Sequence, residues 1–228
     1  MEHVGVIMDG NRRWARKHAL EVFQGHNKGA EVFGHLCDWC LQAKIPYLTV
    51  FAFSTENWQR TESEIKHLMG LMEKYFVEER ERCLEKGVKI QVIGNRELLN
   101  AKARQIVSDI EGATAFCRNL HVNIALSYGG RDEIVRATKK ILRLYELGEI
   151  DEITEDYFES FLDTALCPEV DLVIRTGGSE NRRTSNFLIW QAAYAELFFS
   201  DLLWPDFSQD EFNAALKFYN ESKRNKGK

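Results

Sequence analysis

The chain has 228 residues, of which 44% are hydrophobic and 29% are charged, and its formal net charge is −5. This length and composition are typical of one globular domain, so we expect a single domain over residues 1–228. The negative charge disfavours a nucleic-acid binder that relies on overall electrostatic attraction. No apolar run approaches the roughly 18 residues of a membrane-spanning helix, so we expect a cytoplasmic protein.

Short apolar segments alternate with amphipathic segments along the chain. The apolar runs are typical of strands covered on both faces, and we expect strands at His3–Met8, Tyr47–Phe53, Lys89–Ile93, His121–Ser127, Asp171–Arg175 and Glu196–Phe199. The amphipathic segments predict helices at Gly29–Ala43, Glu62–Lys86, Ala101–Phe116, Arg131–Leu147 and Ser208–Asn220. This alternation predicts an α/β fold in which helices flank a central, mostly parallel, six-stranded sheet.

Polar or glycine-rich segments follow four of the expected strands. They are Asp9–Trp14, Ser54–Trp58, Tyr128–Arg131 and Arg175–Gly178. In open parallel sheets, ligands bind beyond the carboxyl ends of the strands. We therefore expect the functional site at this edge of the sheet.

The segment after the first strand has the composition of a metal and phosphate site. Asp9 is followed by a glycine and then by Asn11, Arg12 and Arg13, which open an expected helix. A carboxylate at a strand end suits Mg²⁺, which prefers oxygen ligands and substrate phosphates. The N–H groups of a helix start and the guanidinium groups of arginine both bind phosphate oxygens. The alternative is that Asp9 only caps the helix and the arginines are solvated, and this segment alone does not decide between the two.

A second cluster follows the fifth expected strand. Here a glycine pair lies between Arg175 and the later Arg182 and Arg183, and Ser185 adds a hydroxyl group. Glycines allow close approach of the backbone to a ligand, so this composition favours an anion site over a solvated loop. The chain has neither nucleotide-binding glycine motif, GxxxxGK[ST] or GxGxxG, nor any Asp-Asp pair. Two anion sites, one carboxylate and an apolar lining suggest two diphosphates with hydrocarbon tails.

Seven segments together resemble the cis-prenyltransferase family, of the undecaprenyl diphosphate synthase type. They are His3–Ala15, Gly25–His26, Phe51–Arg60, Tyr128–Arg131, Asp171–Gly178, Ser185–Gln191 and Tyr194–Phe207. The resemblance implies a Mg²⁺-dependent transferase that condenses isopentenyl diphosphate with an allylic diphosphate such as farnesyl diphosphate. The implied product is a long cis-polyprenyl diphosphate, such as undecaprenyl diphosphate for a cell-wall lipid carrier. It also implies a homodimer, and a peripheral membrane contact for the product stays open.

The resemblance also implies roles for individual residues. Asp9 matches the aspartate that organises Mg²⁺ and the allylic diphosphate, and Asn57 matches a catalytic position. Residues around the allylic diphosphate are matched by Gly10, Asn11, Arg12, Arg13, Trp14 and His26. The segment that closes over the substrates is matched by Ser54, Thr55, Glu56, Asn57, Trp58, Arg60 and Glu64. The isopentenyl diphosphate site is matched by Arg175, Arg183 and Ser185, and Glu196 matches a glutamate that reaches the metal site of the partner subunit.

The chain departs from the family pattern at four places. Val22 replaces an arginine, Thr61 replaces a proline, and the segment between Gly178 and Ser185 is about two residues longer than usual. We match Arg183 rather than Arg182 because it keeps the Arg-x-Ser spacing. The end of the chain, residues 223–227, also differs from the family's usual ending, which helps to cover isopentenyl diphosphate.

A hydrocarbon product needs an apolar tunnel. Possible tunnel walls are Ala52, Leu68, Leu71, Met72, Tyr75 and Phe76, although an apolar stripe at helical spacing is also typical of an ordinary core. Three alternatives remain open from the sequence. They are a short-chain, medium-chain or branching cis-prenyltransferase, a non-catalytic partner subunit, and an unrelated phosphate-ester enzyme.

Overall fold

The computed structural model describes residues 1–150, 152–178 and 181–223. Its strands are β1 (His3–Ile7), β2 (Tyr47–Ser54), β3 (Val88–Ile93), β4 (Leu120–Tyr128), β5 (Leu172–Arg175) and β6 (Glu196–Phe199). Its α-helices are α1 (Asn11–Lys17), α2 (Val22–Gln42), α3 (Glu62–Glu78), α4 (Arg80–Lys86), α5 (Ala101–Thr114), α6 (Gly130–Glu146), α7 (Glu155–Glu159) and α8 (Gln209–Glu221). Short 3-10 helices are η1 (Thr55–Gln59), η2 (Arg96–Leu98) and η3 (Trp204–Asp206). Residues 224–227 of the unusual carboxyl-terminal segment lie outside the described residues, as do 179 and 180 of the long segment before Ser185.

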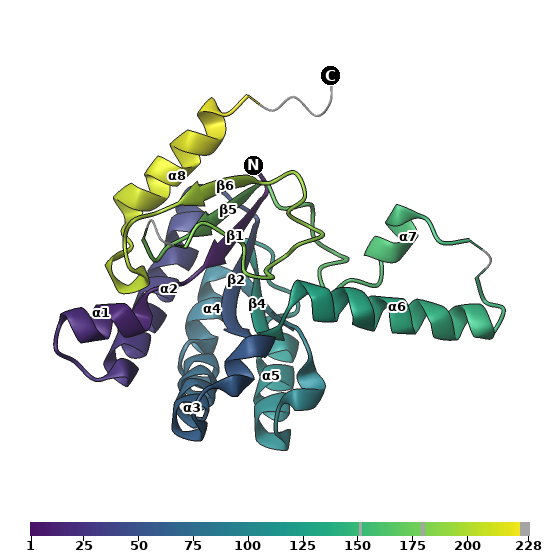
Figure 1. The fold of residues 1–228 in the computed structure, drawn as a ribbon, viewed down its shortest axis with the longest axis horizontal. Coiled ribbons are helices and arrows are strands. Elements are labelled where there is room, and N and C mark those ends of the chain that lie inside the picture. The colour runs from purple at the N-terminus through teal and green to yellow at the C-terminus, as the bar shows by residue number, and fades with distance from the viewer. Residues whose placement is uncertain (151, 179–180, 224–228) are drawn as a thin grey trace.

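The six strands form one sheet in the order β3-β4-β2-β1-β5-β6, and every neighbouring pair is parallel. The expected α/β class and six-stranded sheet are therefore confirmed. All five residues of β1 are buried, as are eight of the nine in β4, because helices cover both faces of the sheet. In Figure 1, α8 lies beside β5 and β6, whereas α3 and α5 lie on the side of β2 and β4.

The register of the central strands brings three carboxyl ends to one edge of the sheet. Ile7 at the end of β1 pairs with Phe51 of β2 and with Arg175 at the end of β5. The pairing of β2 with β4 shifts between Phe51 and Phe53, and such irregularities redirect side chains next to functional sites. The segments that begin at Asp9, Ser54 and Thr176 therefore start close together.

Two helices differ from the expected bounds by more than two residues. α2 begins at Val22 rather than Gly29, because Glu21 and Gln24 form a reciprocal capping box that starts the helix seven residues earlier. The long helix expected over Glu62–Lys86 is divided at Glu79 into α3 and α4. After this division, two side chains of α4 donate hydrogen bonds to Asp38 of α2, Arg82 at 2.6 Å and Lys86 at 2.5 Å.

Candidate active site

Asp9 and Arg175 form the centre of the site at the carboxyl edge of the sheet. Arg175 Nη2 donates a hydrogen bond of 2.9 Å to Asp9 Oδ2, and Arg13 Nη2 lies 3.2 Å from Asp9 Oδ1. Gly10, not Asp9, occupies the N-cap position of α1. The alternative in which Asp9 only caps this helix is therefore wrong, and its carboxylate, 31% exposed, faces two arginines instead.

The backbone holds Asp9 in place. Its carbonyl oxygen accepts hydrogen bonds from Thr176 Oγ1 at 2.7 Å and from Trp204 N at 3.0 Å. Gly177 has a φ of +114°, and a Cβ there would lie 2.7 Å from Arg13 Nη2 and 2.9 Å from Asp9 Cγ. Only glycine fits this position, so the loop after β5 can pack directly against the Asp9 carboxylate.

Arg175 joins Asp9 to the segment around residue 185. Its guanidinium is only 6% exposed, and its Nη1 donates to Ser185 Oγ at 2.7 Å and to the Arg183 carbonyl at 2.6 Å. The structure thus places Arg175 and Ser185 together as the sequence predicts. Arg183 contributes its backbone here, and the side chains of Arg182 and Arg183 are both exposed, so the predicted anion contact of Arg183 stays a prediction.

A second group of basic side chains, two arginines and one histidine, surrounds Glu64 in the first turn of α3. Arg60 Nη1 lies 2.9 Å from Glu64 Oε1, Arg12 Nε lies 3.8 Å from it and His26 Nε2 lies 3.9 Å from it. Burial, and then the charge of Arg60, lower the pKa of His26 from 6.5 to about 4, so this ring is neutral at neutral pH. His26 Nε2 is buried and has no hydrogen-bond partner among the described residues, which leaves it available to a ligand.

Two polar pockets meet at Asp9. The first, of about 380 Å³, is lined by Met8, Asp9, Gly10, Asn11, Arg12, Arg13, Arg16, His26 and Arg60. The second, of about 520 Å³, is lined by Ile7, Met8, Asp9, Phe51, Ser54, Glu56, Asn57, Arg60, Arg175, Ser185 and Asn186. Four arginines border the first pocket against one aspartate, so it suits a ligand with several negative charges.

An apolar cavity of about 160 Å³ adjoins the first pocket. Met8, Asn11, His26 and Arg60 border both spaces, so a ligand headgroup and its hydrocarbon tail can occupy them together. All six residues named as possible tunnel walls line this cavity, namely Ala52, Leu68, Leu71, Met72, Tyr75 and Phe76. The apolar stripe of α3 is therefore the wall of a cavity and not only part of the core.

Comparison with known proteins identifies the family of this chain. A family model described as "Putative undecaprenyl diphosphate synthase" matches residues 7–227. The chain belongs to this family of cis-prenyltransferases. The isoprenyl transferase of Aquifex aeolicus is 44% identical over 227 residues, which cover 100% of this chain and 96% of the relative.

The names of two further similar proteins mention different diphosphates. The first is the tritrans,polycis-undecaprenyl-diphosphate synthase (geranylgeranyl-diphosphate specific) of Thermoplasma acidophilum. It is 40% identical over 230 residues, with 99% of this chain and 88% of the relative covered. The second is the crystal structure of lavandulyl diphosphate synthase from Lavandula x intermedia in complex with dimethylallyl diphosphate. It superposes with a TM-score of 0.96 at 31% identity, covering 100% of this chain and 98% of that one. The expectation of a cis-prenyltransferase, and hence of a transferase, is confirmed.

The segment after β2 of this cis-prenyltransferase is held by hydrogen bonds around η1, to the loop that contains Asn186 and to strand β4. Ser54 N donates to Asn57 Oδ1 at 3.0 Å, and Asn186 Nδ2 donates to Glu56 Oε1 at 3.0 Å. Trp58 donates its Nε1 hydrogen bond to Ser127 Oγ at 2.9 Å. Its ring packs on Phe53.

Four of the predicted substrate-binding residues line neither polar pocket, namely Trp14, Thr55, Trp58 and Arg183. Trp14 Nε1 donates to Asp206 Oδ1 at 2.6 Å, which fixes α1 against η3. The substrate contacts of all four residues stay predictions.

Glu196 lies at the far end of the sheet from Asp9 within one chain. It begins β6 and pairs with Leu172, which pairs with Val4 of β1. Asp9 lies beyond the carboxyl end of β1, so the two carboxylates are not brought together in a single subunit. In the part of the chain that the structure describes, no three His, Cys, Asp or Glu side chains form a metal site.

Two polar residues of the pockets were absent from the predicted site. Arg16 lines the first pocket, four positions after Arg12 on α1, so helical spacing contained a signal for it. Asn186 lines the second pocket and also donates to Glu56. It follows Ser185 directly, but its role depends on contacts with Glu56 and Arg131, which are distant in sequence.

Proposed function

We propose that this cis-prenyltransferase condenses isopentenyl diphosphate with an allylic diphosphate, and repeats the step to build a long cis-polyprenyl diphosphate. One observation carries the proposal: two polar pockets meet at Asp9, and the apolar cavity continues from the first of them. The allylic diphosphate fits the first pocket, because its tail then enters the cavity. Isopentenyl diphosphate fits the second pocket, beside Arg175 and Ser185.

Asp9 suits a Mg²⁺ ion that arrives with a diphosphate. Mg²⁺ keeps several waters and is typically bound through one or two carboxylates together with substrate phosphates. A single carboxylate between two anion pockets matches this pattern, and Arg13 and Arg175 already orient its two oxygens. When bound, Mg²⁺ would supply charge neutralisation for the departing diphosphate.

The residues of the first pocket favour departure of the diphosphate. Arg12, Arg13 and Arg16 place positive charge where the leaving group gains negative charge as the allylic carbon–oxygen bond breaks. The double bond of isopentenyl diphosphate supplies the electron pair for the new carbon–carbon bond. Loss of one proton from the adjacent carbon then restores a double bond in the lengthened chain.

The acceptor of this proton is either the released diphosphate or Asn57. The Oδ1 atom of Asn57 already accepts the Ser54 N–H group, and an amide oxygen is a weak base. We therefore assign the proton to the diphosphate. We assign Asn57 a positioning role at the second pocket, which it lines together with Ser54.

We also propose that the active enzyme is a homodimer. The resemblance matches Glu196 to a glutamate that reaches the metal site of the partner subunit. Glu196 is half-buried on the edge strand β6 and remote from Asp9 of its own chain, so such a contact needs a second subunit. We place the enzyme in the cytoplasm, with a peripheral membrane contact when it hands over its product. No helix among the described residues has the length and apolar character to cross a membrane.

A short-chain or branching reaction is the second candidate. The close superposition on lavandulyl diphosphate synthase favours it, as does the modest size of the apolar cavity. One assay separates the two candidates: labelled isopentenyl diphosphate is incubated with Mg²⁺ and allylic primers of 5, 10, 15 or 20 carbons, and the products are sized. A ladder of long cis products supports chain elongation, whereas one coupling per primer supports the second candidate.

A further inference from the structure

The pairing of β2 with β4 passes over one residue close to the end of β4. Phe53 pairs with Leu126 and the next residue, Ser54, pairs with Tyr128, so Ser127 is the extra residue of an irregularity of the β-bulge kind. A bulge re-aims the side chain of the strand that contains it, and bulges are frequent next to active sites. Ser127 is therefore placed where a side chain can turn toward the site.

Ser127 has a backbone conformation that serine rarely adopts. Its φ is +51°, in the left-handed region that glycine enters without strain. The residue is completely buried, with 0% of its surface exposed. Such strain persists only where surrounding contacts maintain it, and it is concentrated at functional sites.

The loop after β3 fixes the backbone of Ser127 from one side. Asn95 N donates a hydrogen bond of 3.0 Å to the Ser127 carbonyl oxygen. Gly94 has a φ of +119°, and a Cβ there would lie 3.0 Å from the same oxygen and would clash with the carbonyl oxygen of Leu126. The two loops are therefore packed directly against each other, and the Ser127 side chain has a fixed direction.

The hydroxyl group of Ser127 holds η1. Trp58 Nε1 donates a hydrogen bond of 2.9 Å to Ser127 Oγ, and the Trp58 ring packs edge to face on Phe53 with 5.0 Å between centroids. The other end of η1 also lies against the end of β4, because a Cβ at Gly129 would lie 2.7 Å from Thr55 Oγ1. The position of η1 thus depends on the residues that end β4.

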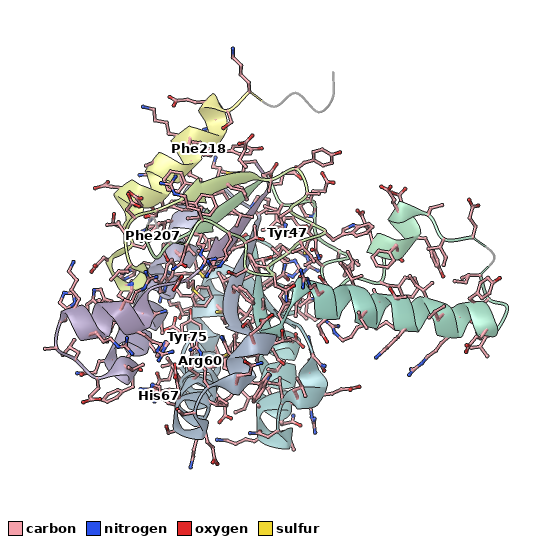
Figure 2. The ribbon with its side chains drawn as sticks, viewed as in Figure 1. Tyr47, Arg60, His67, Tyr75, Phe207 and Phe218 are labelled. Atoms are coloured by element: carbon pink, nitrogen blue, oxygen red, sulfur yellow. The ribbon has the colours of Figure 1, made fainter. Side chains whose placement is uncertain are left out.

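The same segment forms a wall of the second polar pocket. Ser54, Glu56 and Asn57 line this pocket, whereas Trp58 lines neither polar pocket. Arg60, which links η1 to α3, also borders the second pocket (Figure 2). Its own ion pair with Glu64, at 2.9 Å, holds it from the side of α3.

We propose that Ser127 is a positioning residue for isopentenyl diphosphate. Its hydroxyl group holds Trp58, and through Trp58 it holds the η1 wall of the second pocket in the binding arrangement. This inference rests on the proposed function, which assigns isopentenyl diphosphate to that pocket. Ser127 is not among the lining residues of the pocket, so it acts through η1 and not by touching the substrate.

The test removes one hydrogen bond from each of its two ends. Ser127→Gly removes the hydroxyl group and keeps the φ of +51° accessible, and Trp58→Phe removes the N–H group and keeps an aromatic ring. The double variant completes the cycle. Thr114→Val on α5 is the matched control, because Thr114 is also 0% exposed and its hydroxyl group contacts Ile90 N and the Ile110 carbonyl, away from the pockets.

We expect each single variant to raise KM for isopentenyl diphosphate by about fivefold, the size of one lost hydrogen bond. KM for the allylic diphosphate should stay within about twofold, because the arginines of the first pocket are unchanged. The double variant should also show about a fivefold rise, and not the roughly 25-fold rise of two independent losses. Thr114→Val should lower stability in urea and leave both KM values unchanged.

The positioning role and the proposed function fail differently. A parent enzyme that couples isopentenyl diphosphate to no allylic primer would contradict the proposed function. An active parent with unchanged KM values in Ser127→Gly, equal rises for both substrates, or multiplied effects in the double variant would overturn the positioning role alone. A loss of stability without the selective rise in KM would do the same, because the hydroxyl group would then serve only the fold. If Ser127→Gly does not fold, Trp58→Phe decides the question in the same two directions.

Discussion

A hydrogen bond of 2.9 Å joins Arg175 Nη2 to Asp9 Oδ2. Asp9 lies just beyond the end of β1, and Arg175 is the last residue of the neighbouring parallel strand β5. The guanidinium is buried, and the carboxylate faces both polar pockets. This pair therefore connects the two proposed substrate sites.

Asp9→Asn should remove most turnover while leaving the fold intact. The amide keeps the shape of the side chain but loses the negative charge that Arg13 and Arg175 orient and that a metal requires. We expect kcat to fall by about 10²–10³-fold, the range seen when a preorganised electrostatic contact is lost. Steady-state kinetics measure this loss. Asp210→Asn on α8 is the control, and near-normal kcat in Asp9→Asn would show that the metal site is misplaced.

Asp9→Ala and Glu196→Ala test the shared active site. Glu196→Ala should damage activity less than Asp9→Ala, because Asp9 contacts both pockets of its own subunit. If Glu196 reaches across the dimer, mixing the two variants should partly restore activity, since one site then keeps both carboxylates. The assay is run after subunit exchange. Mixtures that are no more active than the sum of the separate variants would rule out the trans arrangement.

Arg16→Ala tests the pocket residue that the motifs did not single out. Loss of one guanidinium from the first pocket should raise KM for the allylic diphosphate by about tenfold, or about 1.4 kcal/mol, without a matching change in KM for isopentenyl diphosphate. Arg143→Ala on α6 is exposed and serves as the control. Equal changes in both KM values would contradict the assignment of the first pocket to the allylic substrate.

The pH dependence of stability should report on His26. Its folded pKa of about 4 lies below the unfolded value of 6.5, so the unfolded chain binds a proton in this window that the folded chain does not. The free energy of unfolding should therefore fall as the pH drops from about 6.5 to 4, by on the order of 3 kcal/mol from this residue. His26→Gln should remove this contribution.

Urea titrations at pH 7 and pH 4 measure the effect of His26→Gln. Burial, and then the charge of Lys89, also lower the pKa of His121 to about 4, but this residue lies away from the pockets. His121→Gln should therefore lessen acid sensitivity while leaving catalysis unchanged. If the stability of His26→Gln and of the parent falls equally between these pH values, His26 is not buried and neutral as described.

Asn186 should position the second pocket. It donates to Glu56 Oε1, and its own Oδ1 accepts the Arg131 N–H group at 2.9 Å. Its φ of 65° is unfavourable for alanine, so Asn186→Ala mixes backbone strain with lost contacts. Asn186→Gly removes the side chain and keeps this φ accessible. A rise of roughly threefold to tenfold in KM for isopentenyl diphosphate in both variants would support positioning, at about 1 kcal/mol for the lost bonds. A defect in Asn186→Ala alone would mean that only the backbone conformation matters.

The arrangement of the central strands explains how much of the site was predictable. Strand–helix alternation placed Asp9 and Ser54 just after strands and Arg175 at the end of one, and a parallel sheet brings such ends to one edge. The contact of Arg175 with Asp9 follows from that topology. The role of Glu64 as the common partner of Arg12, His26 and Arg60 does not, because it depends on where the first turn of α3 packs against α1 and α2.

The indole contacts of two tryptophans could not be predicted from the sequence. Trp14 and Trp58 belong to segments that match the family, and both were predicted to bind substrate. In the structure their indole N–H groups donate to Asp206 and Ser127. A motif shows that a residue of a given type is present. The partner that its side chain contacts depends on tertiary packing, which the motif does not contain.

The central claim is that two diphosphate headgroups bind on either side of the Asp9 carboxylate. A crystal structure with isopentenyl diphosphate, Mg²⁺ and an unreactive thio-analogue of the allylic diphosphate tests it most directly. We predict one headgroup against Arg12, Arg13 and Arg16, the other against Arg175 and Ser185, and the hydrocarbon tail in the cavity beside Ala52. Headgroups bound away from an Asp9 side chain that faces only solvent would contradict the claim.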